Sequence, residues 1–146
     1  MKNQFVNYTQ ALALKHLGFN EICLTYYFPD GFFMDAAEED DTRYPGDDRF
    51  YKHINNENEN ISAPLKQQCF QFFRDKFKLI AFIEPANGTK IKSLFGFYIC
   101  DDEQNIINDK HSYTKESTLH FKTYEKAEEE AINKLIQICE KHLLQK

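Results

Sequence analysis

The chain has 146 residues, of which 42 % are apolar, and it contains 14 Phe, 8 Tyr and no Trp. A chain of this length fits one domain and buries enough surface for its own core, so the composition argues against disorder. The net charge of −5 argues against a basic nucleic-acid-binding surface, and the absence of any 18-residue apolar run argues against a membrane span. We therefore expect a soluble, cytoplasmic protein.

The first predicted element is a helix within FVNYTQALALKHLGF, residues 5–19. Asn7 suits the N-cap position with Gln10 three residues later, and Gly18 suits the left-handed position that follows a last helical turn. One face of this helix is apolar and is expected to be buried: Tyr8, Ala11, Leu14 and Leu17.

A hairpin is predicted next. Residues 21–28, EICLTYYF, are rich in strand-forming side chains, Pro29-Asp30-Gly31 is a turn sequence, and apolar residues resume at 32–34. Aromatic side chains of such a hairpin usually pack into the core. We expect this for five of them: Tyr26, Tyr27, Phe28, Phe32 and Phe33.

Residues 63–77, APLKQQCFQFFRDKF, predict an amphipathic helix with Ser62 or Ala63 near its cap and Pro64 in its first turn. Its inward stripe is Leu65, Cys69, Phe72, Phe73 and Phe77. Its outward stripe is Gln67, Gln71, Arg74 and Lys78.

Two strands, 79–84 and 90–100, flank Asn87-Gly88, a strong hairpin signal. Residues 79–83 are apolar on both faces, which predicts a central strand. A polar loop, 101–116, and a short strand, 118–122, are expected to follow.

Thr123 can cap a last helix, with glutamates near its start and basic residues near its end, as the helix dipole favours. Its apolar positions recur at helical spacing: Tyr124, Ala127, Ala131, Leu135, Ile138 and Leu143. The order of elements predicts a single α+β domain, residues 1–146, with a long acidic irregular loop at 35–62. We expect an antiparallel sheet of about five strands with three helices packed on one face.

Motifs for catalysis or cofactor binding are not found. The cysteines (Cys23, Cys69, Cys100 and Cys139) lack metal-site spacing and are expected to be reduced, structural thiols, and the glycines do not form a phosphate-binding loop. We expect no catalytic residue, no metal and no cofactor. Asp101-Asp102-Glu103 is read as a solvated turn rather than an acid/base cluster. A small hydrolase would require His53, His111 or His120 to meet Asp101 or Asp102.

The segment DAAEEDDTRYPGDD, residues 35–48, holds seven carboxylates and one arginine, whereas the other 132 residues hold 17 basic and 16 acidic groups. Like charges repel unless a cationic partner offsets them, and a row of carboxylates can occupy a Lys/Arg-lined channel in place of phosphates. Neighbouring Arg and Tyr side chains would act as anchors. The expected partner-binding residues are Glu38, Glu39, Asp40, Asp41, Arg43, Tyr44, Asp47, Asp48, Arg49 and Tyr51.

Two other interpretations of the surface stay open. The acidic segment can serve solubility alone. The outer face of the helix at 63–77, with Gln67, Gln71 and Arg74, can equally be a contact surface.

Three segments, FVNYTQALALKHLGF, APLKQQCFQFFRDKF and TYEKAEEEAINKLIQI, resemble a small family of uncharacterised proteins from phages and mobile elements of Bacteroidetes. The shared patterns are F-V-x-Y-x-Q-A-L-A-L-K-x-L-G-F, A-P-x-x-Q-Q-x-F-x-x-F-R-x-K and Y-E-x-A-E. The loop after Met34 is longer and more acidic than the pattern. The resemblance implies a mobile-element origin and supplies no catalytic residues.

Small acidic phage proteins are often antagonists of host defence, including anti-CRISPR proteins. By this analogy we expect a non-enzymatic binding protein that acts in the cytoplasm of a host bacterial cell. It would inhibit a nucleic-acid-handling defence effector, such as an RNA-guided nuclease, by docking the acidic loop on a basic surface. The alternatives are a structural or accessory phage adaptor and a small metal-dependent hydrolase.

Overall fold

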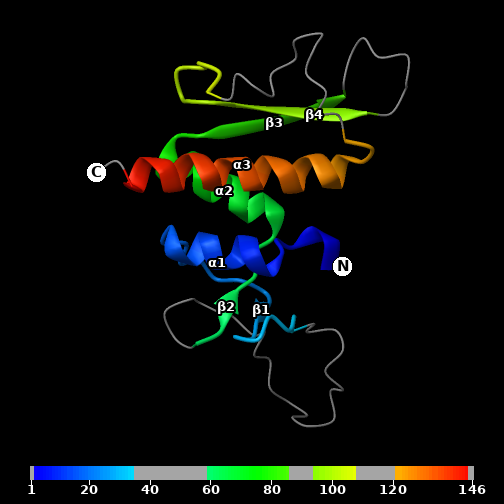
Figure 1. The fold of residues 1–146 in the computed structure, drawn as a ribbon, viewed down its shortest axis with the longest axis vertical. Helices are drawn as coiled ribbons and strands as arrows, with labels where there is room; N and C mark the ends of the chain where they lie inside the picture. Colours follow the sequence, from blue (N-terminus) through cyan, green and yellow to red (C-terminus); the bar gives the residue numbers. More distant parts are fainter. Residues whose placement is uncertain (1, 35–58, 86–93, 108–120, 145–146) are drawn as a thin grey trace. The chain divides into compact units, whose positions relative to one another are not determined.

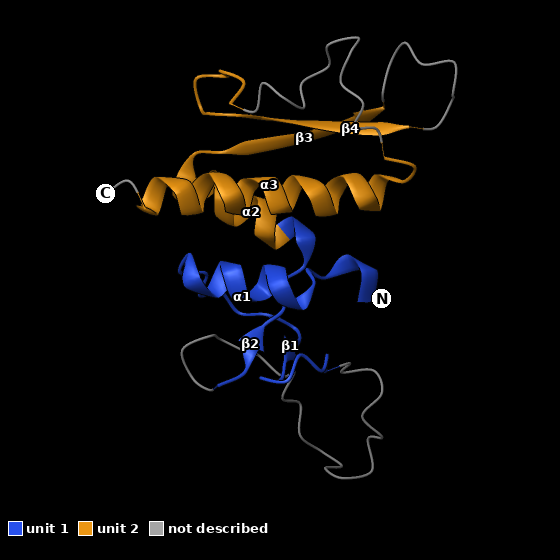
Figure 2. Cartoon of the chain, viewed as in Figure 1, with its two compact units in different colours: residues 1–67 blue, residues 68–146 orange. Residues whose placement is uncertain are grey.

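The computed structural model describes residues 2–34, 59–85, 94–107 and 121–144 (Figure 1). These residues form an α+β structure with two compact units, residues 1–67 and 68–146 (Figure 2). The α+β class is confirmed, while the expected single domain stays a prediction. In chain order the elements are η1 (Lys2–Gln4), α1 (Tyr8–His16), β1 (Tyr26–Tyr27), β2 (Ile61–Ser62), α2 (Lys66–Phe77), β3 (Ile80–Pro85), β4 (Phe95–Cys100) and α3 (Tyr124–Leu144).

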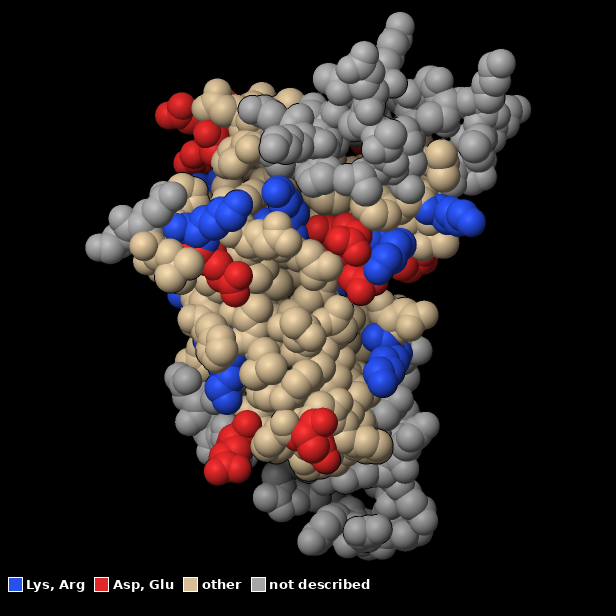
Figure 3. All heavy atoms as spheres, in the orientation of Figure 1, with Lys and Arg blue, Asp and Glu red and all other residues tan. Residues whose placement is uncertain are grey.

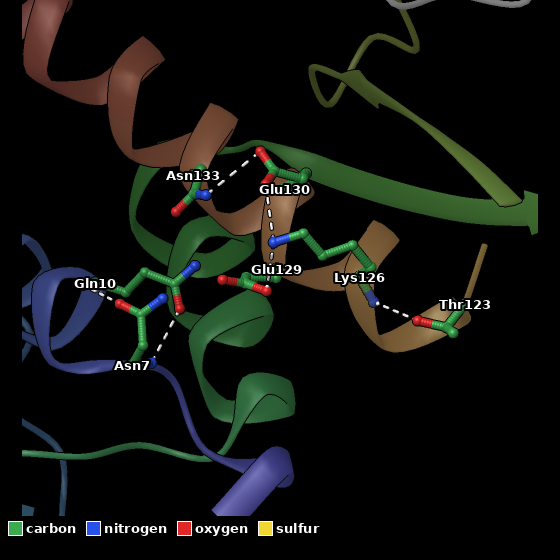
Figure 4. Close-up of polar contacts among 7 residues, drawn as sticks. All are labelled: Asn7, Gln10, Thr123, Lys126, Glu129, Glu130 and Asn133. Atoms are coloured by element: carbon green, nitrogen blue, oxygen red, sulfur yellow. Dashed lines mark hydrogen bonds and ion pairs between the residues drawn. The ribbon is translucent and has the colours of Figure 1, made fainter. Parts of the chain in front are cut away.

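Helix α1 begins and ends as its sequence predicts. Asn7 Oδ1 accepts a hydrogen bond from the Gln10 amide at 3.0 Å, and Gln10 Oε1 accepts one from the Asn7 amide at 3.1 Å (Figure 4). This reciprocal capping box satisfies two amides that the helix leaves without carbonyl partners. After the last turn, Gly18 has φ +84°, a left-handed conformation that glycine adopts without a Cβ clash.

The sheet of unit 1 joins segments that are distant in the chain. Tyr26 pairs with Ser62 and Tyr27 with Ile61 in an antiparallel ladder, and α1 packs against β2. Within this unit the Tyr27 hydroxyl donates to the Val6 carbonyl oxygen at 2.8 Å. The large apolar side chains buried in unit 1 include Val6, Leu14, Leu17, Phe19, Tyr27, Phe33 and Ile61.

The predicted start of the second helix is wrong. Ser62 belongs to β2, the Pro64 carbonyl oxygen accepts a hydrogen bond from the Val6 amide at 3.1 Å, and Leu65 forms a bridge with Phe5. Helix α2 therefore begins only at Lys66. A cap residue and a proline are compatible with an extended strand end as well, and here the long-range backbone pairing takes these residues.

The body of α2 follows the predicted stripes. Cys69, Phe72 and Phe73 are buried, and the outward stripe of Gln67, Gln71, Arg74 and Lys78 is exposed. The ring of Phe77 lies 5.6 Å from that of Phe72 and 5.9 Å from that of Phe73, measured between centroids. The inward stripe is thus an aromatic cluster.

In unit 2, β3 and β4 pair antiparallel from Ile80–Cys100 to Pro85–Phe95. Helix α3 covers one face of this sheet, on which Phe97 and Ile99 are buried (Figure 1). The edge of β4 that faces away from β3 is also paired. The Phe95 amide donates to the Phe121 carbonyl oxygen at 2.8 Å, and the Phe121 amide donates to the Phe95 carbonyl oxygen at 2.9 Å. The Ile107 amide donates to the Ile99 carbonyl oxygen on the same edge at 2.8 Å.

The expected sheet of about five strands is not formed by the described residues, which hold two separate two-stranded sheets. The strand expected at 118–122 lies mostly outside the described residues, and its described residue Phe121 forms a single bridge to Phe95.

In the described sheet, β3 pairs with β4 on one edge, whereas β4 has partners on both of its edges. The apolar segment at 79–83 is therefore not the central strand of this sheet. Its outward apolar residue, Phe82, is 44 % exposed and stacks on Tyr98 across the ladder, with ring centroids 5.0 Å apart. Cross-strand aromatic stacking thus accounts for the second apolar face.

Helix α3 is capped as predicted: Thr123 Oγ1 accepts a hydrogen bond from the Lys126 amide at 3.2 Å (Figure 4). Its buried stripe is Ala127, Ala131, Ile132, Leu135, Ile136 and Cys139. Tyr124 and Leu143, expected in that stripe, are exposed, whereas Ile132 and Ile136, which the single row does not include, are buried. A stripe of adjacent positions is wider than the single row that the spacing suggests.

Within the described ranges, every helix is too short or too polar to cross a membrane.

Candidate protein-binding surface

The expected partner-binding residues lie outside the residues that the structure describes. They are Glu38, Glu39, Asp40, Asp41, Arg43, Tyr44, Asp47, Asp48, Arg49 and Tyr51, and the same holds for His53, His111 and His120. The structure instead describes the residues at both ends of segment 35–58. The candidate site therefore consists of these end residues, which include Met34 and Ile61 and which we call the stem.

Both ends of the segment are attached to β1. On one side, the Met34 amide donates to the Tyr26 carbonyl oxygen at 2.9 Å, and the Thr25 hydroxyl donates to the Met34 carbonyl oxygen. On the other side, Ile61 pairs with Tyr27, and the Ala63 amide donates to the Thr25 carbonyl oxygen at 3.0 Å. The described residues on either side of segment 35–58 thus both pair with the same short stretch of chain around β1.

The predicted turn at Pro29-Asp30-Gly31 is confirmed, with Tyr27 bridged to Phe33, whereas the strand expected over residues 21–28 is limited to β1, Tyr26–Tyr27. The Gly31 amide donates to the Phe28 carbonyl oxygen, and the Phe28 amide donates to the Phe32 carbonyl oxygen, both at 2.9 Å. Asp30 Oδ1 accepts a hydrogen bond from the Phe32 amide at 3.0 Å, which closes the turn as an Asx motif.

Helix α1 supports the tip of this hairpin. The Tyr8 hydroxyl donates to the Pro29 carbonyl oxygen at 2.7 Å. Gly31 has φ +86°, and a Cβ placed on it would lie 3.5 Å from the Tyr8 ring. The left-handed backbone at residue 31 therefore favours glycine, and the Tyr8 side chain of α1 packs against this residue.

The outer side of the hairpin is apolar. Phe32 is 69 % exposed, Leu24 is 55 % exposed and Ile22 is 49 % exposed. The ring of Phe28 lies 5.2 Å from the ring of Tyr26 and 6.3 Å from that of Phe32. We call these five residues the hairpin surface: Ile22, Leu24, Tyr26, Phe28 and Phe32.

The core expectation for the hairpin aromatics holds for Tyr27 and Phe33, which are buried, and is wrong for Phe32. Strand alternation explains part of this result, because Cys23, Thr25 and Tyr27 point inward. The outward residues between them are apolar too, so the sequence lacks the polar-out pattern that would have identified an exposed side.

The net charge divides unevenly between the units. Residues 1–67 contain 6 basic and 11 acidic side chains, and residues 68–146 contain 12 of each. Figure 3 shows acidic and basic side chains interspersed over the part of unit 2 that faces the viewer, in keeping with its balanced count. All of the formal net charge of −5 therefore belongs to residues 1–67.

The acidic cluster after β4 is a turn, as predicted. Asp101 accepts hydrogen bonds from the Asn105 amide at 2.8 Å and from Asn105 Nδ2 at 2.9 Å. These bonds to Asn105 lower the pKa of the Asp101 carboxyl.

Among the described residues, no three His, Cys, Asp or Glu side chains gather into a group that could hold a metal ion. His16 and His142 are exposed on their helices.

The four cysteines are buried and free, as expected. Burial raises the pKa of Cys23 and of Cys139 to about 12 and also raises that of Cys69. The pKa of Cys100 is raised by burial and by the Asp101 carboxylate. Protonated, buried thiols are poor nucleophiles and poor metal ligands.

No protein-family model, curated protein or solved structure matches this chain.

Proposed function

We propose that this chain is a non-enzymatic binding protein that docks its acidic segment, residues 35–48, on a basic surface of another protein. The observation that carries the proposal is the charge of that segment, which holds seven carboxylates against one arginine. Such a row of charges attracts a cationic surface over a long range and accelerates association.

The stem supports this function. Because Met34 and Ile61 both contact β1, the segment is attached to a folded unit at both ends rather than hanging from one. Closing the ends of a segment lowers the conformational entropy that binding must remove, so more of the electrostatic attraction appears as affinity.

The most concrete partner is a host protein that handles nucleic acids, in particular an RNA-guided nuclease. Such proteins hold nucleic acid in channels lined by Lys and Arg, which recognise the phosphate backbone. Carboxylates placed in that channel occupy the same cations. The proposed outcome is inhibition of a defence effector by a phage or mobile-element protein, in line with the sequence resemblance.

The test uses purified protein and purified RNA-guided nucleases in a DNA cleavage assay and in a binding assay at increasing salt. We expect inhibition of cleavage and a complex whose affinity falls about tenfold or more as the Debye length shrinks from ~10 to ~3 Å. A panel of effectors that shows no salt-sensitive complex would contradict the proposal.

A charge-matched pair of variants locates the effect. The first variant carries Glu38→Gln, Glu39→Gln, Asp40→Asn and Asp41→Asn, and we expect it to associate more slowly. The control carries Asp102→Asn, Glu103→Gln, Glu125→Gln and Glu140→Gln in unit 2, which changes the net charge equally. Equal association rates for the two variants would place the interface elsewhere.

A further inference from the structure

The outer edge of strand β3 is the edge that faces away from β4, and the hydrogen bonds of β4 show which residues lie along it. Phe95 of β4 exchanges two hydrogen bonds with Phe121 on the side away from β3. The Ile99 carbonyl oxygen accepts the Ile107 amide on that same side. Backbone groups alternate in direction along an antiparallel strand, so the odd-numbered residues of β4 bond away from β3 and the even-numbered residues bond to it.

Ala81 and Ile83 are the residues of β3 that direct their backbone groups to the outer edge. The ladder places Ala81 opposite Ile99 and Ile83 opposite Phe97, and neither pair exchanges hydrogen bonds because the β4 residues bond away. Among the described residues, none pairs with β3 at this edge. Phe97 and Ile99 are buried, whereas Ala81 and Ile83 are half-buried, so apolar surface remains there too.

The outer edge offers no amide beyond these two. The Leu79 amide already donates to the Phe73 carbonyl oxygen at 3.2 Å, and Pro85 has no amide hydrogen. Natural proteins usually protect an edge strand with charged side chains, bulges or a covering segment. Residues 79–83, LIAFI, carry no charge. The edge is therefore a short pairing site with defined ends.

We propose that the outer edge of β3 pairs antiparallel with the same edge of a second copy of this chain, about a two-fold axis at Phe82. This proposal does not depend on the acidic segment. Ala81 of each copy exchanges two hydrogen bonds with Ile83 of the other copy. This register satisfies all four outer backbone groups of each strand, whereas an axis at Ala81 or at Ile83 leaves a carbonyl oxygen unpaired.

Two properties of the segment favour a second copy as the occupant. An axis at Phe82 places the two Phe82 side chains opposite each other in a non-hydrogen-bonded pair, where side chains are closest. Phe82 is 44 % exposed and stacks on Tyr98, so the aromatic row continues from one copy to the other. The apolar pattern of residues 79–83 is also typical of a strand with neighbours on both edges, which β3 becomes in the joined sheet.

Cross-linking tests both the association and its register. Cα atoms of a non-hydrogen-bonded pair lie about 4.5 Å apart, within disulfide range, and the native cysteines are buried. Under mild oxidation we expect Phe82→Cys to form a covalent dimer much faster than Ile106→Cys, a control at a position of the same unit that is 47 % exposed. Equal rates for the two variants would overturn the inference.

Sedimentation of the unmodified full chain should show a monomer–dimer equilibrium. Phe82→Lys and Phe82→Glu should each weaken it about tenfold or more, because like charges then lie opposite each other, and mixing the two variants should restore a mixed dimer. Circular dichroism checks that both variants are folded. A chain that stays monomeric up to its solubility limit overturns the inference and leaves the edge to a strand of a different protein. Failure of the two variants to form a mixed dimer also overturns it.

Discussion

Lys78, the residue after helix α2, has a left-handed conformation, with φ +58°, that L-residues other than Asn and Asp rarely adopt. The Leu79 amide donates to the Phe73 carbonyl oxygen at 3.2 Å, and Leu79 is buried. A left-handed residue directly after the last helical turn is a position that favours glycine. The Lys78 side chain is exposed and its ammonium donates to the Asp75 carbonyl oxygen at 3.0 Å.

We predict that Lys78→Gly increases the free energy of unfolding, because removing the Cβ relieves a left-handed penalty of about 1 kcal/mol. The measurement is chemical denaturation followed by circular dichroism. Lys78→Ala is the control, since it removes the same ammonium and keeps the Cβ. A gain in stability for Lys78→Ala as large as that for Lys78→Gly would attribute the effect to the side chain instead.

The buried cysteines make a second prediction at this scale. Because burial raises the pKa of Cys23 and Cys139 to about 12, these thiols stay protonated at pH 8 in the native protein. We expect a thiol reagent to label them only as fast as the protein unfolds, and to label them quickly in denaturant. Rapid labelling of native protein would show that these thiols are accessible.

The pH dependence has a definite sign. Between the ordinary thiol pKa and about 12, the unfolded chain binds fewer protons at Cys23 and Cys139 than the native one. The free energy of unfolding should therefore decrease as the pH rises through this window. Replacing both cysteines by Ala should reduce that slope in a urea titration series.

Among the elements, helix α3 depends on a cap that can be tested separately from its packing. Thr123 Oγ1 satisfies the Lys126 amide, one of the four amides that a helix start leaves without a carbonyl partner. We predict that Thr123→Ala lowers the free energy of unfolding by about 1 kcal/mol. Thr123→Ser keeps the hydroxyl and should cost much less in the same denaturation experiment. Equal losses for Ala and Ser would assign the effect to the lost methyl group.

The elements that sequence predicted well are those whose signals are local. The ends of α1 follow from Asn7, Gln10 and Gly18, all within a few residues of the helix, and Thr123 gives the start of α3 in the same way. Backbone pairing between distant segments is not visible in such signals. The local sequence therefore predicts Ser62 as a helix cap, whereas in the structure Ser62 belongs to β2 and pairs with Tyr26, which is distant in the chain.

The candidate surface was predictable only in part. The hairpin turn follows from Pro29-Asp30-Gly31, because these residues favour a turn whatever surrounds them. The exposure of Phe32 does not follow, because an apolar residue is not obliged to be buried and its neighbours in sequence are apolar too. The Tyr8 hydroxyl, which holds the backbone of the turn at Pro29, comes from a distant part of the sequence.

For the molecule as a whole, the distribution of charge is more informative than its total. Acidic residues also cluster in the first half of α3, where Glu129 and Glu130 lie 2.9 and 3.3 Å from the Lys126 ammonium. These pairs reduce the local field, although exposed ion pairs contribute little to stability. Residues 68–146 are electrically balanced, and residues 1–67 carry the imbalance.

This asymmetry predicts where a polycation binds. In an NMR titration with oligolysine at low salt, we expect amide shifts in residues 1–67 and little change in residues 68–146, because only the former carry a net charge. The shifts should disappear at high salt, since exposed charges are screened beyond ~3 Å at 1 M ionic strength. The amides around Glu125 and Glu128 in α3 are the internal control. Shifts there as large as those near the stem residues Met34 and Ile61 would mean that local acidity, rather than the net charge of residues 1–67, determines binding.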